Sequence, residues 1–185
     1  MNKGKLIVVS GPSGVGKDTV VGEYLKKHPE DEISVSMTSR PMRDNDIEGV
    51  TYYFKTKEQF EEAIKNGDLL EYAEYNGNYY GTPKSEIENR LKNGINVILV
   101  IEVVGAKNVK DMMGDDCTLI FVMPPSMEEL ENRLINRGTD SEDSIKNRLD
   151  IARREIEVSH IYDYKIVNDE LEKAVNELEK IIKSI

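Results

Sequence analysis

The chain has 185 residues, a length typical of one domain that carries small insertions. Residues of the AVILMFWYC set make up 38%, and Gly raises the share to about 45%, which excludes a mainly disordered chain. The single Cys excludes an internal disulfide framework and a cysteine-cluster metal site. Because 35 acidic residues outnumber 25 basic ones, the net charge of −10 opposes nonspecific binding to nucleic acid or to an anionic membrane.

No apolar run approaches the roughly 18 residues of a membrane span. The best candidate, residues 96–104, is short and contains Glu102. The first residues enter a strand and a turn before they could form the apolar part of a signal peptide. We therefore expect a cytoplasmic protein with neither a membrane nor a nucleic-acid partner.

Short apolar runs without alternation predict strands that are buried on both faces, as in a parallel sheet. These runs are residues 6–10, 97–104, 118–123 and 165–167. Helical spacing of apolar residues predicts helices over 18–27, 85–93, 106–113 and 171–185, the last with Asn168 and Asp169 as candidate caps. The alternation of strands and helices predicts an α/β fold, with a mostly parallel sheet flanked by helices.

Residues 34–82 interrupt this alternation of strands and helices and are predicted to form a small β-rich insertion. Within it, 34–38 and 50–54 are short and β-prone, and 72–80 predicts a hairpin that turns around Asn76 and Gly77. A second irregular stretch, 137–144, joins two charged helices and is predicted to be a mobile flap.

The segment GPSGVGK, residues 11–17, lies directly between a predicted strand and a predicted helix. Phosphate needs many donors that converge in a small space, and glycine lets the backbone wrap so that successive amides and the helix N-terminus face the anion. Lys17 adds a charge that can reach a transferred group. The pattern predicts a phosphate loop of a nucleotide-binding protein, formed by Gly11, Pro12, Ser13, Gly14, Val15, Gly16, Lys17, Asp18 and Thr19.

Asp18 stands where the usual phosphate-loop motif has a hydroxyl that contacts Mg²⁺, and Thr19 keeps one hydroxyl available to a phosphate. We hypothesise that Asp18 approaches the Mg²⁺ of MgATP, directly or through water. The alternative is an acid that is stabilised by the positive N-terminus of the helix.

A second anion site is predicted in the insertion. Arg40 and Arg43 lie three residues apart, and guanidinium forks match phosphate oxygens while tyrosine hydroxyls add neutral donors. The simpler interpretation is a solvated surface pair. A guanine base presents donors that suit carboxylates and acceptors that suit hydroxyls, and the insertion carries both kinds of side chain.

Seven segments together resemble the guanylate kinase family over nearly the whole chain. In chain order they are GPSGVGK, SMTSRPMR, EGVTYYF, EYAEYNGNYYGTP, ILVIEVVGA, PPSMEELENRLINRGTDSEDSIKNRL and IVND. The resemblance implies transfer of the γ-phosphate of MgATP to GMP, and also to dGMP, with Mg²⁺ as the cofactor. It further implies a phosphate-loop NTPase core of residues 1–33, 83–125 and 155–185. A nucleoside-monophosphate-binding insertion would then span 34–82, and a short lid 126–154.

The resemblance also implies roles for individual residues. The phosphate of GMP would be held by Arg40, Arg43, Tyr52 and Tyr80, with Asp46 beside them. The guanine base would be recognised by Ser36, Glu71, Thr82 and Glu102. The transferring phosphoryl group would be surrounded by Lys17, Arg133, Arg137 and Arg148, and ATP would also contact Asn168.

Several positions depart from the family pattern. The common TTRxPRxGE appears as TSRPMRDND, so the proline is Pro41, Asn45 replaces Gly, and Asp46 is one methylene shorter than Glu. The strand that often has the pattern L-[DE]-I-D-x-Q-G is LVIEVVG here, with Val100 and Val104 in place of polar residues and Glu102 in place of Asp.

Other interpretations stay open. Arg133 lies four residues after Glu129, and Arg148 four after Ser144, so ordinary pairing on a helix surface could explain either arginine. For the whole chain, the alternatives are a guanylate-kinase-like scaffold that binds phosphorylated partners, or a related phosphate-loop kinase that acts on a sugar phosphate. Retention of Lys17 together with the lid arginines disfavours the scaffold.

Overall fold

A five-stranded parallel sheet forms the centre of the molecule. The structure is a computed structural model that describes residues 3–75, 77–136, 138 and 141–185. In sheet order the strands are β2 (Glu32–Ile33), β7 (Val97–Val100), β1 (Leu6–Ser10), β8 (Cys117–Met123) and β9 (Tyr164–Val167). All neighbouring strands run parallel, so their carboxyl ends share one edge of the sheet.

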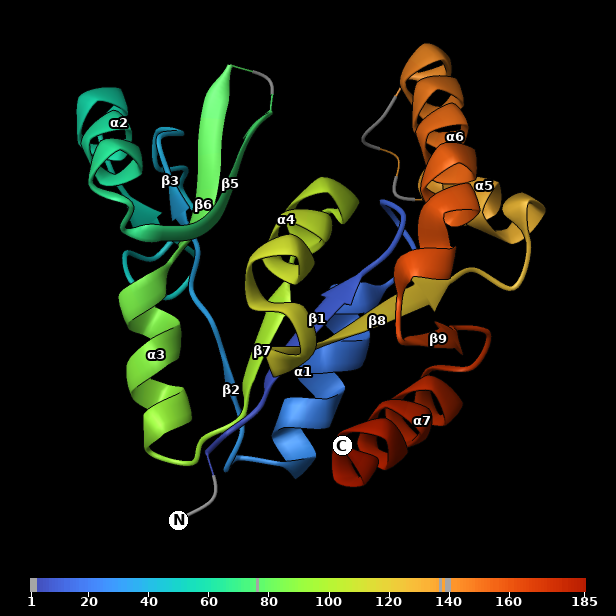
Figure 1. The fold of residues 1–185 in the computed structure, drawn as a ribbon. Helices are drawn as coiled ribbons and strands as arrows, with labels where there is room; N and C mark the ends of the chain where they lie inside the picture. The colour runs from blue at the N-terminus through green and yellow to red at the C-terminus, as the bar shows by residue number, and fades with distance from the viewer. Residues whose placement is uncertain (1–2, 76, 137, 139–140) are drawn as a thin grey trace.

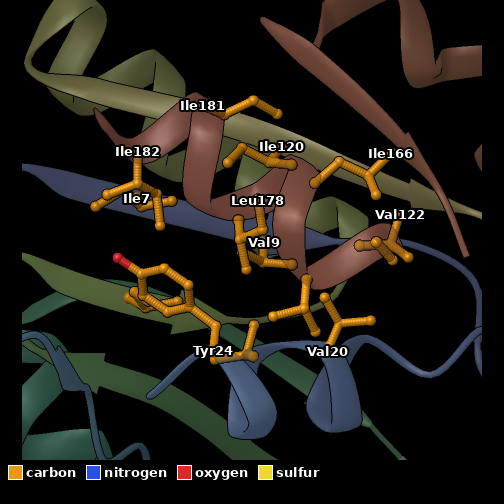
Figure 2. Packing of buried hydrophobic residues seen from close by; sticks show 14 of the residues in the cluster. Ile7, Val9, Val20, Tyr24, Ile120, Val122, Ile166, Leu178, Ile181 and Ile182 are labelled. Carbon is orange, nitrogen blue, oxygen red and sulfur yellow. The ribbon is translucent and has the colours of Figure 1, made fainter. Parts of the chain in front are cut away.

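Helices cover both faces of this sheet, which confirms the predicted α/β fold (Figure 1). On one face, α1 (Lys17–Lys27) and α7 (Leu171–Ser184) pack against Ile7 and Val9 of β1. Figure 2 shows Val20 and Tyr24 of α1 and Leu178 of α7 in this layer. On the other face, α3 (Lys84–Lys92) and α4 (Val103–Met113) pack with Leu6 and Val8. Successive residues of β1 therefore enter opposite cores, which explains the apolar run without alternation.

A second sheet of four strands is built from the segment between β2 and α3. Its order is β4 (Tyr53–Phe54), β3 (Met37–Thr38), β6 (Asn78–Pro83) and β5 (Leu69–Tyr75). Strands β5 and β6 form the predicted antiparallel hairpin, with Gly77 in the turn at φ 75°. Helix α2 (Lys57–Asn66) covers this sheet through Phe60, which packs with Met37 and Leu69.

Helices α5 (Met127–Asn136) and α6 (Glu142–Glu157) form a pair with a small core of its own, made by Leu130, Leu134, Leu149 and Ala152. Figure 1 shows the four-stranded sheet at the upper left and this pair at the upper right, with the strands of the central sheet below and between them. Two short 3₁₀ helices, η1 (Gly114–Asp116) and η2 (Val158–Ile161), complete the elements. Within the described ranges, no helix is long and apolar enough to cross a membrane.

Two predicted boundaries near the site were wrong. The strand predicted over 97–104 ends at Val100, and α4 begins at Val103 with the exposed Glu102 as its N-cap residue. The apolar run continues because Val103 is the first buried residue of the helix, and an apolar run alone does not distinguish a strand from a buried helix start. At the last helix, the N-cap residue is Glu170 rather than Asn168 or Asp169.

The insertion also differs from expectation. Of the segments 34–38 and 50–54, only Met37–Thr38 and Tyr53–Phe54 are strands, and the chain between them is mostly loop and turn. Helix α2 was not predicted from the sequence, although Thr56 and Gln59 form a capping box and Gly67, at φ 73°, ends the helix.

Candidate active site

The phosphate loop follows β1 and leads directly into α1, as its sequence predicted. Gly14 and Gly16 adopt left-handed φ angles of 86° and 91°, which glycine adopts without strain. Lys17 is only 8% exposed, and its Nζ donates a hydrogen bond of 3.2 Å to the Gly11 carbonyl. The lysine thereby bridges the two ends of the loop, with its charge beside the amides that would face a phosphate.

A contact from behind the loop holds the Val15 carbonyl. Asn168 Nδ2 donates to this oxygen at 2.8 Å, and Arg133 Nη1 does so at 3.4 Å. Arg133 Nη2 also donates to the Asn168 carbonyl at 3.0 Å, and its Nε pairs with Glu129 at 3.0 Å. The helix-surface pair that the spacing allowed is therefore present, and the same guanidinium also reaches the loop.

Helix α6 contributes a second arginine to the loop. Arg148 Nη1 donates to the Ser13 hydroxyl at 3.0 Å, so this side chain reaches the phosphate loop rather than lying on the outer surface. Arg137, which was predicted to be the third arginine of this group, lies outside the described residues.

Asp18 and Thr19 are exposed in the first turn of α1. Both the predicted approach to Mg²⁺ and the alternative, stabilisation by the helix N-terminus, fit this position. Among the residues that the structure describes, no three His, Cys, Asp or Glu side chains gather into a metal-binding group.

The insertion holds Arg40 in a tightly defined position. Its Nη1 and Nη2 donate to the two oxygens of Asp46 at 2.8 and 3.1 Å, and both side chains are 9% exposed. The guanidinium carbon lies 5.4 Å from the centre of the Tyr52 ring and 5.5 Å from that of Phe54. Hydrogen bonding to Asp46 raises the pKa of Arg40, and the bonds from Arg40 and the Arg43 amide lower the pKa of Asp46.

The tyrosines predicted at this site lie together. Tyr52 and Tyr80 make an edge-to-face contact with ring centres 5.9 Å apart, and Arg43 nearby is exposed. Burial is the main cause that raises the pKa of Tyr52, and the charge of Asp18 also contributes.

Glu71 and Thr82, predicted to contact guanine, form a buried polar pair. Thr82 Oγ1 donates to Glu71 Oε1 at 2.7 Å, and burial raises the pKa of the Glu71 carboxyl. The other oxygen, Oε2, lies against Gly105 of α4, where an added Cβ would be 2.8 Å away. Ser36 is half-buried, and Glu102 is exposed at the start of α4. The structure thus joins Glu71 to Thr82, whereas among the described residues no hydrogen bond links this pair to Ser36 or Glu102.

One acidic residue near the loop was missed from the sequence. Burial and the charge of Glu102 raise the pKa of Glu155 to about 7, while the charge of Lys17 opposes the shift. Glu155 lies on α6 two turns after Arg148, on the same helix face. That spacing was the available signal, but α6 carries charges on many positions, so the residue did not stand out.

A glycine-rich loop between a central parallel strand and a helix, with a buried lysine and an arginine facing it, defines the phosphate-loop class of α/β proteins. The family model described as guanylate kinase matches residues 3–185. A guanylate kinase of Oceanobacillus iheyensis is 49% identical over 182 residues, 98% of this chain and 88% of that protein. The chain therefore belongs to the guanylate kinase family.

Two further relatives agree. A guanylate kinase of Synechococcus is 48% identical over 180 residues, which cover 97% of this chain and 82% of that protein. The crystal structure of guanylate kinase from Anaplasma phagocytophilum matches with a TM-score of 0.80 and 36% identity, over 99% of this chain and 86% of the other. The similarity thus extends over sequence and three-dimensional structure alike.

Proposed function

We propose that this protein transfers the γ-phosphate of MgATP to GMP, and also to dGMP, giving ADP and GDP or dGDP. The observation that carries the proposal is the pair of anion sites: the phosphate loop with Lys17, and the Arg40–Asp46 pair of the insertion. A phosphate loop alone suits many nucleotide-binding proteins, whereas a second arginine site beside a buried carboxylate suits a phosphorylated purine acceptor.

In this proposal the insertion recognises GMP. Arg40 and Arg43, with the hydroxyls of Tyr52 and Tyr80, bind its phosphate, and Asp46 orients Arg40. The guanine base is bound through Glu71 and Thr82, with Ser36 and Glu102 nearby at the edge of the pocket. A carboxylate at Glu71 accepts hydrogen bonds from the guanine N–H groups, which adenine does not present in the same arrangement.

In the reaction, an oxygen of the GMP phosphate attacks the γ-phosphorus of ATP. A bond to that phosphorus forms, the bond to the oxygen that bridges the β- and γ-phosphates breaks, and ADP leaves. Lys17, Arg148 and Arg137 stabilise the charge on the moving group, so positioning and electrostatics carry the catalysis. Asp18 would hold Mg²⁺, directly or through water, and the ion would supply positive charge that neutralises part of the charge of the ATP phosphates.

Residues 34–82 would act as the acceptor-binding segment and 126–154 as a lid, and both would move inward over the bound nucleotides. Closure would exclude water and so limit hydrolysis of ATP. A cytoplasmic location belongs to the same proposal.

The test is product analysis after incubation of the protein with MgATP and GMP. Anion-exchange chromatography is expected to show ADP and GDP in equal amounts, with no inorganic phosphate. Lys17→Ala is expected to abolish both products. Binding of GMP without formation of ADP would support the scaffold alternative and contradict the proposal, as would transfer to a sugar phosphate in preference to GMP.

A further inference from the structure

The carbonyl of Val15 controls the direction of one amide in the phosphate loop. Val15 C=O and Gly16 N–H belong to the same peptide unit, and in a planar trans peptide they point in opposite directions. An oxygen drawn out of the loop therefore aims the Gly16 N–H into it, toward a bound phosphate. The position of this single oxygen thus decides whether the amide helps to bind the anion.

Two donors hold the Val15 oxygen on the outer side of the loop. Asn168 Nδ2 lies 2.8 Å away and Arg133 Nη1 3.4 Å away. Val15 is fully buried and Asn168 is 7% exposed, so water cannot replace these donors easily. A Cβ on Gly16 would lie 2.6 Å from Asn168 Nδ2. The close approach of the Asn168 side chain to the loop therefore also depends on the absence of a side chain at position 16.

Asn168 is itself fixed from two directions. Its backbone N–H donates to the Met123 carbonyl at 2.9 Å, which ties it to the end of β8. Its own carbonyl accepts Arg133 Nη2 at 3.0 Å, and Glu129 holds Arg133 from the other side at 3.0 Å. The contact on Val15 therefore belongs to a rigid network that joins the central sheet, α5 and the phosphate loop.

We propose that Asn168 is a positioning residue for the phosphates of ATP, because it aims the Gly16 amide into the loop, and that Arg133 supports it in this task. Sequence similarity assigned Asn168 to ATP and Arg133 to the moving phosphoryl group. In the network, by contrast, both side chains act on the loop through the Val15 carbonyl, on the side away from the proposed phosphate site. The inference rests on the proposed function only in taking ATP as the nucleotide.

A probe without a base separates positioning from direct contact with ATP. Titration calorimetry would compare binding of MgATP and of inorganic tripolyphosphate to the wild-type protein and to Asn168→Asp, which replaces the donor by an acceptor of the same shape. The variant is expected to weaken both ligands by about tenfold, the effect of one lost buried hydrogen bond. Asp169→Asn is the control, because it is an amide–acid exchange at the adjacent, exposed position.

Weaker binding of MgATP with unchanged binding of tripolyphosphate would overturn the proposal, since it would mean that Asn168 contacts only the nucleoside part. Unchanged binding of both ligands would overturn it as well. Failure of GMP turnover would contradict the proposed function but would leave these binding results intact, so the two failures are distinguishable.

A second variant and a second readout cover the case in which Asn168→Asp does not fold. Arg133→Gln removes the longer of the two contacts and is expected to weaken both ligands by about threefold. In ¹⁵N-labelled protein, tripolyphosphate is expected to move the Gly16 amide proton downfield, and Arg133→Gln to reduce that shift. An identical Gly16 shift and identical affinity in this variant and the wild type would contradict the network.

Discussion

Asp46 accepts hydrogen bonds from both terminal nitrogens of Arg40, at 2.8 and 3.1 Å, and its Oδ2 also accepts the backbone amide of Arg43 at 2.7 Å. One carboxylate thus fixes the guanidinium of the first arginine and the backbone of the second. The rings of Tyr52 and Phe54 both lie within 5.5 Å of the Arg40 guanidinium carbon, and they contact each other edge to face with ring centres 5.9 Å apart. The pair therefore holds Arg40, the centre of the proposed second anion site, in a defined orientation.

Asp46→Asn is expected to raise the KM for GMP by about tenfold, while the KM for ATP stays within about twofold of the wild-type value. The neutral amide accepts fewer hydrogen bonds and leaves the buried Arg40 without its counter-charge, so the guanidinium loses its orientation. Steady-state kinetics with each substrate varied in turn provide the measurement.

Asp46→Glu is the matched variant, because it keeps the charge and is expected to retain most of the affinity for GMP. Equal effects of Asp46→Asn on the KM values for GMP and ATP would show that the pair serves general stability instead.

Gly105→Ala is expected to lower kcat/KM for GMP without lowering the melting temperature. A Cβ at this position would lie 2.8 Å from Glu71 Oε2, so the carboxylate must move away from its present place. Alanine is also the better helix former, by up to about 1 kcal/mol, so the fold itself should not suffer. Thermal unfolding and kinetics on the same preparation separate the two effects.

Gly22→Ala provides the control for that substitution. Gly22 also lies in a helix, α1, and an added Cβ there would meet nothing within 4 Å. It is expected to match or exceed the wild-type stability with unchanged kinetics for GMP. If both variants reduced turnover of GMP equally, the contact between Gly105 and Glu71 would have no part in guanine recognition.

Glu155 makes the free energy of unfolding depend on pH. The pKa of Glu155 is about 7 in the folded protein and 4.5 in the unfolded chain. At a pH between these two values, the folded state holds a proton that the unfolded state has released. Stability from this group is therefore lost as the pH rises from about 4.5 to 7. The full effect is roughly 3 kcal/mol before solvent screening reduces it.

Glu155→Gln removes this dependence, because glutamine resembles the protonated acid and does not titrate. The variant is expected to be more stable than the wild type at pH 8 and nearly equal to it at pH 4.5, as measured by urea unfolding. Glu157→Gln, at an exposed position on the same helix, serves as the control. A stability difference that is the same at both pH values would refute the assignment.

The features that could be predicted from the sequence are those encoded by neighbouring residues. GPSGVGK combines its glycines, its lysine and its flanking strand and helix within a few residues, so the loop needed no tertiary information. The buried strands and the hairpin at Gly77 were predicted for the same reason. The end of β7 was not predicted. Val103 is a buried apolar residue at the start of α4, and a buried apolar residue is equally typical of a strand.

Contacts between distant segments explain what the sequence alone could not show. Asn168 was predicted as a helix cap because Asn favours that position, but its amide is held by Val15, 153 residues away. Asp46 was assigned to GMP binding by similarity, and its pairing with Arg40 depends on how the loop between β3 and β4 folds back. Glu155 acquires its raised pKa only because folding buries it and brings it near the charge of Glu102, against the opposing charge of Lys17.

The central claim is that Arg40 binds the phosphate of the acceptor and that Glu71 and Thr82 select guanine, so that a guanine nucleotide receives the phosphoryl group transferred at Lys17. The most direct test is the kcat/KM of the protein with MgATP and, in turn, GMP, AMP, CMP and UMP. We predict that GMP exceeds each of the others by a factor on the order of 10³ or more, and that Glu71→Gln removes most of this preference. Equal turnover of AMP and GMP, or a preference that Glu71→Gln leaves intact, would contradict the claim.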